Sequence, residues 1–174
     1  MEQKKSDRFA ETVLPHLDAA YNLARWLTRN QHDAEDVVQE AYLRALRFFD
    51  GFRGGDGRGW LLAIVRNTCY TWLERDRGRA HTELDEDTPC AECGPTNPEA
   101  LLLEKLNAAS VSACIEELPV EFREVIVMRE LEELSYKEVA AAAGVPIGTV
   151  MSRLARARKR LEDCLTARLK GGRE

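Results

Sequence analysis

The apolar periodicity of this chain stops in the middle of the sequence. On either side of residues 80–97, apolar side chains recur every three or four positions, as they do on one face of a helix. Residues 80–97 hold acidic side chains, two prolines and a glycine, but almost no large apolar side chain. Such a composition is typical of a solvated linker. We therefore expect two small domains, residues 1–79 and 98–174, joined by an acidic linker over 80–97.

The periodic segments predict helices, and no segment carries a competing strand signal. Apolar residues from Val37 to Phe49 follow helical spacing, and Asp33 is a plausible N-cap for that helix. The glycine-rich stretch from Asp50 to Gly59 must end it, and a further helix resumes at Trp60. Trp60 and Trp72 are interpreted as core residues more readily than as stacking platforms. The predicted fold class is all-α.

The C-terminal segment contains a helix-turn-helix pattern. Ser135 and Glu138 form a capping box before a short, alanine-rich helix. Gly144 allows a tight turn, Pro146 follows it, and a longer helix runs to about Leu169. An apolar stripe on the longer helix leaves the remaining faces to polar and cationic side chains. The second helix of such a pattern can enter the major groove of DNA.

The distribution of charge is compatible with DNA binding although the net charge is −5. Residues 80–117 carry nine acidic side chains and one basic side chain, whereas residues 146–160 carry five basic and no acidic ones. A phosphate backbone responds to the local charge. The alternative for the basic run is an ordinary solvated helix face. Ser152, Arg153, Arg156 and Lys159 lie outside the apolar stripe and are the candidate DNA contacts.

Other classes of protein find little support in the sequence. No apolar run is long enough for a transmembrane helix, and the N-terminus lacks a secretory signal, so a cytoplasmic location is expected. Five scattered cysteines are unlike a secreted disulfide framework. Cys90 and Cys93, with His81 nearby, form a single CxxC pair and predict free thiols, with a redox or metal response as the minor alternative. We expect no catalytic set, cofactor, metal or small-molecule substrate.

Six groups of residues, two in the N-terminal half and four in the C-terminal half, carry a family resemblance. In the N-terminal half they are the segments 33–40 (DAEDVVQE) and 60–67 (WLLAIVRN). In the C-terminal half they are Glu117-Leu118-Pro119 with Phe122-Arg123, 134–140 (LSYKEVA), 144–150 (GVPIGTV), and 152–154 (SRL) with 156–158 (RAR). These motifs resemble those of extracytoplasmic-function (ECF) sigma factors of bacterial RNA polymerase. The resemblance covers nearly the whole chain, in the family's order and with the linker in the right place.

The resemblance implies a role for each half. The N-terminal domain is expected to bind the clamp helices of the largest polymerase subunit and to recognise and melt the −10 promoter element. Its polymerase contacts would be Asp36, Gln39, Glu40 and Leu43. Its −10 contacts would be the loop 50–59 and Arg66, Asn67, Tyr70, Arg75 and Arg77, with Arg79 as a further cation.

The C-terminal domain is expected to sit on the polymerase flap and to read the −35 element through Thr149, Ser152, Arg153, Arg156 and Lys159. Met151 and Ala155 depart from the residues that several family members carry, so the family's promoter sequence does not transfer. An anti-sigma factor is an implied partner. Two other readings stay open: a sigma mimic that sequesters an anti-sigma factor, and a helix-turn-helix repressor that works without polymerase.

Overall fold

The computed structural model describes residues 1–77 and 98–171, and its secondary structure within these ranges is helical throughout. The predicted all-α fold is therefore confirmed. The acidic segment 80–97, including His81, Cys90 and Cys93, lies outside the described residues, and so does Arg79. Within the described ranges, no helix combines the length and the apolar character that crossing a membrane requires.

The N-terminal half is built from four α-helices. They are α1 (Glu2–Val13), α2 (Leu17–Thr28), α3 (Gln31–Phe48) and α4 (Gly57–Arg77), with short 3₁₀ turns at Leu14–His16 and Phe49–Gly51. Helices α2, α3 and α4 pack against one another, and α1 contacts α4. The core between them consists of small and branched side chains such as Leu23, Leu27, Leu61 and Val65.

The N-cap of α3 differs from the sequence expectation. Asn30, in an extended conformation, accepts a hydrogen bond from the backbone N–H of Asp33 at 3.1 Å. Asp33 therefore lies in the first turn of the helix and is not its cap. Both residue types favour the N-cap position, so composition alone could not separate them.

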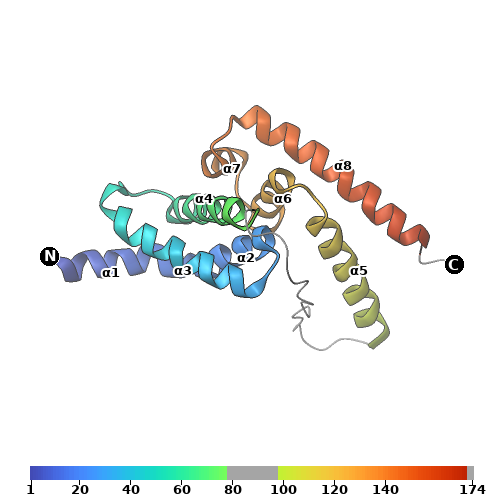
Figure 1. The fold of residues 1–174 in the computed structure, drawn as a ribbon, viewed down its shortest axis with the longest axis horizontal. Helices are drawn as coiled ribbons and strands as arrows, with labels where there is room; N and C mark the ends of the chain where they lie inside the picture. Colours follow the sequence, from blue (N-terminus) through green and yellow to red (C-terminus); the bar gives the residue numbers. More distant parts are fainter. Residues whose placement is uncertain (78–97, 172–174) are drawn as a thin grey trace.

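The C-terminal half contains α5 (Pro98–Glu116), α6 (Val120–Ile126), a π-helical turn at Val127–Leu131, α7 (Tyr136–Ala143) and α8 (Ile147–Gly171). Helix α8 packs on α5, α6 and α7. Figure 1 shows that α1 begins at one end of the molecule and α8 ends at the other, with α6 and α7 near the middle.

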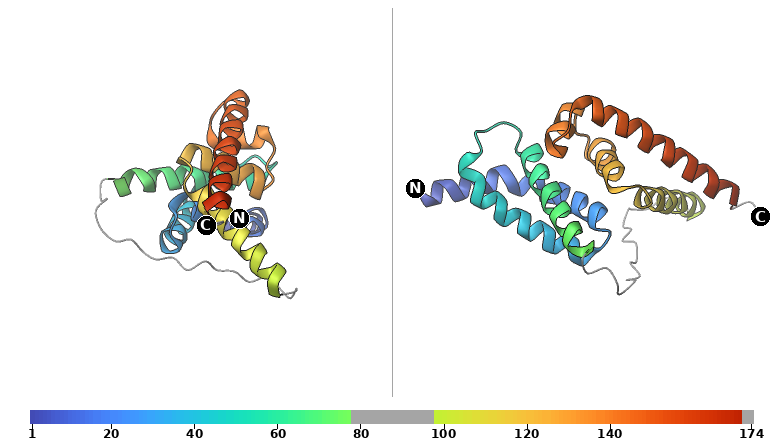
Figure 2. Two further views of the ribbon diagram at one scale, coloured as in Figure 1. Left: turned by 90° about the vertical axis from the view of Figure 1, so that its right-hand side faces the viewer. Right: turned by 45° about the horizontal axis from the view of Figure 1, so that its top comes forward.

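The two halves share a contact surface. Helix α4 contacts α7, and α2 contacts α6, so that the buried residues of both halves form one continuous apolar cluster. The start of α4 lies beside α7 in the right-hand view of Figure 2. The helix-turn-helix is thus in direct contact with the helix that carries the candidate −10 residues.

Candidate nucleic-acid interface

The helix-turn-helix forms as its sequence predicts. The Ser135 side chain accepts a hydrogen bond from the backbone N–H of Glu138 at 3.1 Å, and the Glu138 carboxylate accepts one from the backbone N–H of Ser135 at 2.6 Å. The capping box is therefore complete. Gly144 ends α7 with φ of 67°, a conformation that glycine adopts without strain. These two local signals set where α7 begins and where it ends.

Helix α8 presents different residues to the core and to solvent. Val150, Leu154 and Ala157 are buried against the rest of the C-terminal half. Ser152 and Arg156 are exposed, and Thr149 is half-buried. The exposed face therefore combines a hydroxyl and a guanidinium, which are the groups that read base edges and phosphates in a major groove.

Several cations of α8 already have partners within the chain. Lys159 pairs with Asp163 one turn further on, at 2.8 Å. Arg158 binds Glu130, and the Arg160 guanidinium lies 5.1 Å from the centre of the Phe122 ring. Arg153 is half-buried, and its Nη1 lies 3.6 Å from the carboxylate of Glu124. Arg156 is thus a more accessible candidate contact than Arg153.

The glycine-rich loop before α4 is held by α1 and by an aromatic cluster. Gly54 and Gly55 both have positive φ values, which a side chain would strain. A Cβ atom on Gly57 would meet the side chain of Thr12 at 2.8 Å and its carbonyl oxygen at 2.9 Å, so only glycine fits against α1 there. The Phe49 ring contacts the Phe52 ring, and the Phe52 ring contacts the Trp60 ring, with 5.0 Å between the centroids of this second pair.

Both tryptophans of α4 are half-buried. Trp60 and Trp72 pack against the apolar core without being enclosed by it. Their predicted role as core residues is therefore confirmed only in part.

Three of the candidate −10 residues lie together on α4. The Arg66 guanidinium stacks over the Tyr70 ring at 3.8 Å from its centre, and its Nη1 donates a hydrogen bond to the Asn67 side-chain oxygen at 3.3 Å. Asn67 is exposed, whereas Arg66 and Tyr70 are half-buried. Arg75 and Arg77 are exposed on the last turns of the same helix. A cation, an amide and an aromatic face together suit an unstacked nucleotide.

Glu124 is the member of this cluster that sequence reasoning missed. Its carboxylate, on α6, is fully buried and accepts hydrogen bonds from Arg66 at 2.8 Å and 3.3 Å. Burial raises the pKa of Glu124, although Arg66 opposes this effect. Burial is the largest single influence on the pKa of Arg66 and lowers it, but the hydrogen bond and charge of Glu124, together with Tyr70, outweigh it, so the net shift is upward. The signal in the sequence was a lone acid directly before an apolar run, Val125 to Met128.

The candidate polymerase contacts share one exposed face of α3. Asp36, Gln39, Glu40 and Leu43 are all exposed, and the Glu40 carboxylate also pairs with Arg44 at 2.9 Å. Gln39 and Leu43 border an open apolar groove of about 420 Å³. The remaining lining of the groove comes from Leu14, Leu17, Val38 and Tyr42.

A second cavity joins the α3 face to α4. It has a volume of about 240 Å³, and Asp36 and Glu40 of α3 line it together with Trp72 and Arg75 of α4. The structure therefore brings a predicted −10 residue, Arg75, to the edge of the predicted polymerase-binding face. The spacing in the sequence had not suggested this.

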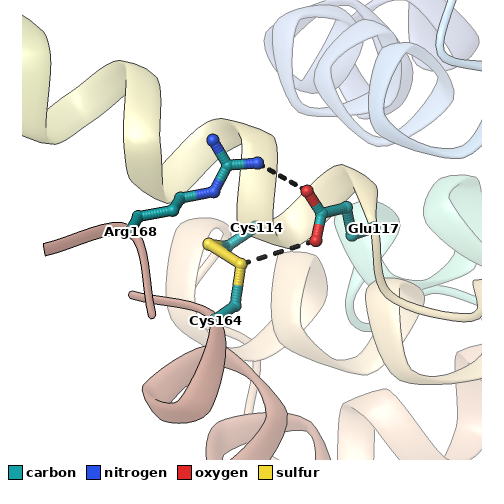
Figure 3. The surroundings of a disulfide bond; sticks show 4 residues. All are labelled: Cys114, Glu117, Cys164 and Arg168. Carbon is teal, nitrogen blue, oxygen red and sulfur yellow. Dashed lines mark hydrogen bonds and ion pairs between the residues drawn. A yellow bond between two sulfur atoms is a disulfide. The ribbon is translucent and has the colours of Figure 1, made fainter. Parts of the chain in front are cut away.

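A disulfide links two helices of the C-terminal half. Cys114 at the end of α5 is bonded to Cys164 of α8, and the two Cα atoms are 5.9 Å apart. Beside this bond, Glu117 accepts a hydrogen bond from Arg168, and its other carboxylate oxygen lies 3.5 Å from the Cys164 sulfur, which has no hydrogen to donate (Figure 3). The expectation that the scattered cysteines form no disulfide framework missed this pair. Among the described residues, no group of histidines, cysteines and carboxylates is placed to hold a metal ion.

Comparison with known protein families assigns both halves. The model for sigma-70 region 2 matches residues 12–79, and the model for sigma-70 region 4 matches residues 108–161. The first range contains α3, the glycine-rich loop and α4. The second contains the helix-turn-helix and the cationic part of α8.

Characterised relatives carry the same assignment. The chain is 40% identical over 156 residues to the ECF RNA polymerase sigma factor SigE of Mycolicibacterium smegmatis, covering 89% of this chain but 60% of that protein. It is 39% identical over 140 residues to the ECF RNA polymerase sigma-E factor of Escherichia coli K12, covering 75% of this chain and 73% of that protein. The chain thus spans about three fifths of the length of the mycobacterial relative.

Two solved structures share the arrangement of both halves. The sigma factor RpoE of Bartonella quintana, in complex with the anti-sigma factor NepR, matches with a TM-score of 0.74 and 28% identity, covering 91% of this chain and 97% of that one. CnrH, in complex with the cytosolic domain of CnrY, matches with a TM-score of 0.65 and 27% identity, covering 93% and 90%. With its two matched regions in the order α3–α4 and then α7–α8, the chain belongs to the family of ECF RNA polymerase sigma factors.

Proposed function

We propose that this chain binds core RNA polymerase and directs it to promoters by recognising −35 and −10 elements and helping to open the DNA. The observation that carries this proposal is the combination of an exposed, partly apolar α3 face with two separate DNA-type sites on α4 and α8. A DNA-binding protein that works alone needs no such α3 face. Membership of the ECF sigma family supports the same reading.

Residues 1–79 form the part that engages polymerase and the −10 element. Asp36, Gln39, Glu40 and Leu43 present carboxylate, amide and apolar groups on one face of α3, and this face docks on the clamp helices of the largest polymerase subunit. Leu43 is 58% exposed and borders the apolar groove on this face, so the exposed apolar surface is contiguous, as at surfaces that bind a partner protein.

Helix α4 and the loop before it hold the melted −10 strand. Asn67 offers an amide to a base edge, Tyr70 offers an aromatic face, and Arg75 and Arg77 offer cations to the backbone. Gly54 and Gly55 leave the loop without side chains where a base would approach. Arg66 contributes a further cation only once its hydrogen bond to Glu124 is broken.

Residues 98–174 carry the −35 site, and the acidic segment 80–97 connects the two sites. Ser152 and Arg156 of α8 face solvent and contact base edges, with Thr149 and Arg153 beside them and Lys159 on the flanking phosphate. The same part of the chain contacts the polymerase flap.

An anti-sigma factor is part of this proposal. The similar structures of RpoE and CnrH were both determined with a bound partner protein, and the first of these partners is named as an anti-sigma factor. We place the activity in the cytoplasm, where core polymerase works. The chain acts through binding and not as an enzyme.

Run-off transcription with purified core polymerase tests the proposal. The template is the DNA upstream of the gene for this chain, together with a library of random upstream sequences. Promoter-dependent initiation that appears only when the chain is added supports the proposal. The matched control is Asp36→Ala, which keeps both DNA sites and is expected to lose initiation because it binds polymerase less well.

Two other outcomes would assign the chain to another class. Binding to DNA with no association with core polymerase would indicate a helix-turn-helix repressor. Binding to an anti-sigma factor with neither polymerase association nor DNA binding would indicate a sigma mimic.

A further inference from the structure

One buried carboxylate holds an arginine from each of the two candidate DNA sites. Glu124 of α6 accepts hydrogen bonds from Arg66 of α4 at 2.8 Å and 3.3 Å, and it lies 3.6 Å from Arg153 of α8. The Glu124 side chain has no exposed area, whereas the side chains of Arg66 and Arg153 are 18% and 25% exposed. The carboxylate therefore occupies the position beside each guanidinium that a nucleic-acid phosphate would need.

The pairing with Arg66 also holds the neighbouring −10 residues. Arg66 stacks on Tyr70 and bonds to Asn67, so the three side chains form one cluster around the carboxylate. Because Glu124 belongs to the C-terminal half and Arg66 to the N-terminal half, this cluster spans the contact between the two halves. DNA can bind Arg66 only if the contact between the two halves breaks.

The same contact covers the start of α4. Trp60 and Ala63 of α4 face Lys137 and Ala141 of α7 across an apolar groove of about 390 Å³. Elsewhere in the contact between the two halves, the Asn22 side chain of α2 donates a hydrogen bond to the Glu132 carboxylate at 2.5 Å. A strand laid on α4 from the loop 50–59 onward would have to displace α7.

We propose that Glu124 is an internal latch that keeps the unbound chain closed, by holding Arg66 across the contact until polymerase and promoter DNA separate the two halves. The proposal rests on the proposed function, because it assigns a regulatory role to the contacts of that same DNA site. Its basis is geometric: Glu124 is buried and joins α6 of the C-terminal half to α4 of the N-terminal half through Arg66, whereas its contact with Arg153 lies within the C-terminal half.

The energetics of Glu124 suit a reversible latch. In a poorly hydrated contact, its attraction to Arg66 is much stronger than in water and favours the closed arrangement over the open one. Burial of the carboxylate opposes this gain, as the raised pKa of Glu124 indicates. A buried ion pair of this kind contributes specificity of arrangement more than global stability. Removing its charge should therefore open the chain without unfolding it.

The main test compares Glu124→Gln with Glu130→Gln in the full chain. Both variants remove one carboxylate that pairs with an arginine of α8, but Glu130 is exposed and its partner, Arg158, lies in the same half. Small-angle X-ray scattering measures the radius of gyration, and fluorescence anisotropy measures binding to a short, mixed-sequence single-stranded DNA. Glu124→Gln is expected to expand the chain and to bind DNA about tenfold more tightly, or by about 1.4 kcal/mol. Glu130→Gln is expected to match the wild type in both measurements.

The two measurements separate failure of the latch from failure of the proposed function. If Glu124→Gln remains as compact as the wild type, the latch is wrong. If the variant expands but binds DNA no better, the latch is supported, and the assignment of Arg66 to DNA is wrong.

A locked chain provides an independent test if Glu124→Gln does not fold. Asn22 and Glu132 contact each other across the two halves, so cysteines at these positions can be joined by a short bis-maleimide linker. The background carries Cys90→Ser and Cys93→Ser. The linked chain is expected to bind single-stranded DNA at least about tenfold more weakly than the same protein before linking. Equal binding before and after linking would overturn the latch.

Discussion

Arg66 of α4 donates a hydrogen bond at 2.8 Å to Glu124 of α6, so an arginine from the N-terminal half is paired with a fully buried acid from the C-terminal half. This pairing makes the DNA chemistry of the chain depend on how its two halves are arranged. It also makes the ionisation of Glu124 measurable through the stability of the whole protein.

The first prediction concerns pH. Burial raises the pKa of Glu124 above its ordinary value of 4.5, so the folded chain binds this proton more tightly than the unfolded chain. The stability contributed by protonated Glu124 is present below about pH 4.5 and is lost as the pH rises through the raised pKa. Glu124→Gln cannot titrate. The free energy of unfolding of the wild type should therefore fall relative to that of the variant as the pH rises from 4.5 towards 8. Urea denaturation of both proteins measures the difference, and a difference that grows in favour of the wild type would contradict the prediction.

The second prediction concerns the −35 site. Arg153→Ala and Arg156→Ala are each expected to weaken binding to a duplex that contains the −35 element, by about 1–3 kcal/mol where the side chain contacts a base. The matched control is Arg168→Ala, because Arg168 belongs to the same helix but pairs with Glu117 near its far end. Fluorescence anisotropy at fixed salt measures the affinities. Similar losses for all three variants would indicate non-specific attraction to α8.

The third prediction concerns the α3 face. Asp36→Ala and Leu43→Ala are expected to reduce association with core polymerase and to leave DNA binding by the unbound chain unchanged. Glu35→Ala is the control, since Glu35 is also exposed on α3 but is outside the predicted set. Biolayer interferometry with immobilised core polymerase measures the association. The assignment of this face would be withdrawn if Glu35→Ala were as harmful as Asp36→Ala.

The fourth prediction concerns Cys69. Burial raises the pKa of this thiol to about 12, and the nearby Glu124 carboxylate adds to the shift. Because the thiolate is the reactive form, Cys69 should resist alkylation by iodoacetamide at pH 8 in the folded chain and react once the chain is unfolded. Peptide mapping by mass spectrometry measures the modification. Rapid modification in the folded chain would show that α4 is open to solvent at this position.

The fifth prediction concerns the disulfide. Reduction of the Cys114–Cys164 bond is expected to lower the melting temperature, because the bond closes a loop with a sequence separation of 50 residues. The chain-entropy model gives an upper estimate of about 4 kcal/mol for such a loop. The variant Cys164→Ser carries its own control, since a reducing agent should shift the melting temperature of the wild type and not that of the variant. Equal shifts of the melting temperature in the wild type and the variant would show that the disulfide is not the cause.

Local signals predicted the fold, and long-range contacts limited what could be predicted of the site. Ser135, Glu138 and Gly144 set the boundaries of α7 through backbone hydrogen bonds within a few residues, so the sequence sufficed there. The start of α3 was placed wrongly because Asn30 and Asp33 are both good N-caps, and only the backbone conformation of Asn30 decides between them.

The exposure of the α3 candidates, and of Ser152, Arg156 and Lys159 on α8, could be predicted because an amphipathic helix buries its apolar face and leaves the other faces to solvent. The roles of these residues stay predictions. Glu124 and the disulfide were not found. The partners of Glu124 lie on α4 and α8, and Cys114 and Cys164 come from α5 and α8. The spacing of residues in the sequence does not predict which positions on different helices come into contact when the helices pack.

The disulfide also bears on how α8 meets DNA. The helix is continuous from Ile147 to Gly171, with Ser152 and Arg156 near its beginning and Cys164 in its second half. Because the disulfide joins α8 to α5 in its second half, α8 can neither slide along α5 nor rotate about its own axis. The direction in which Ser152 and Arg156 face the groove is thus set by a covalent bond about two to three helical turns away from them.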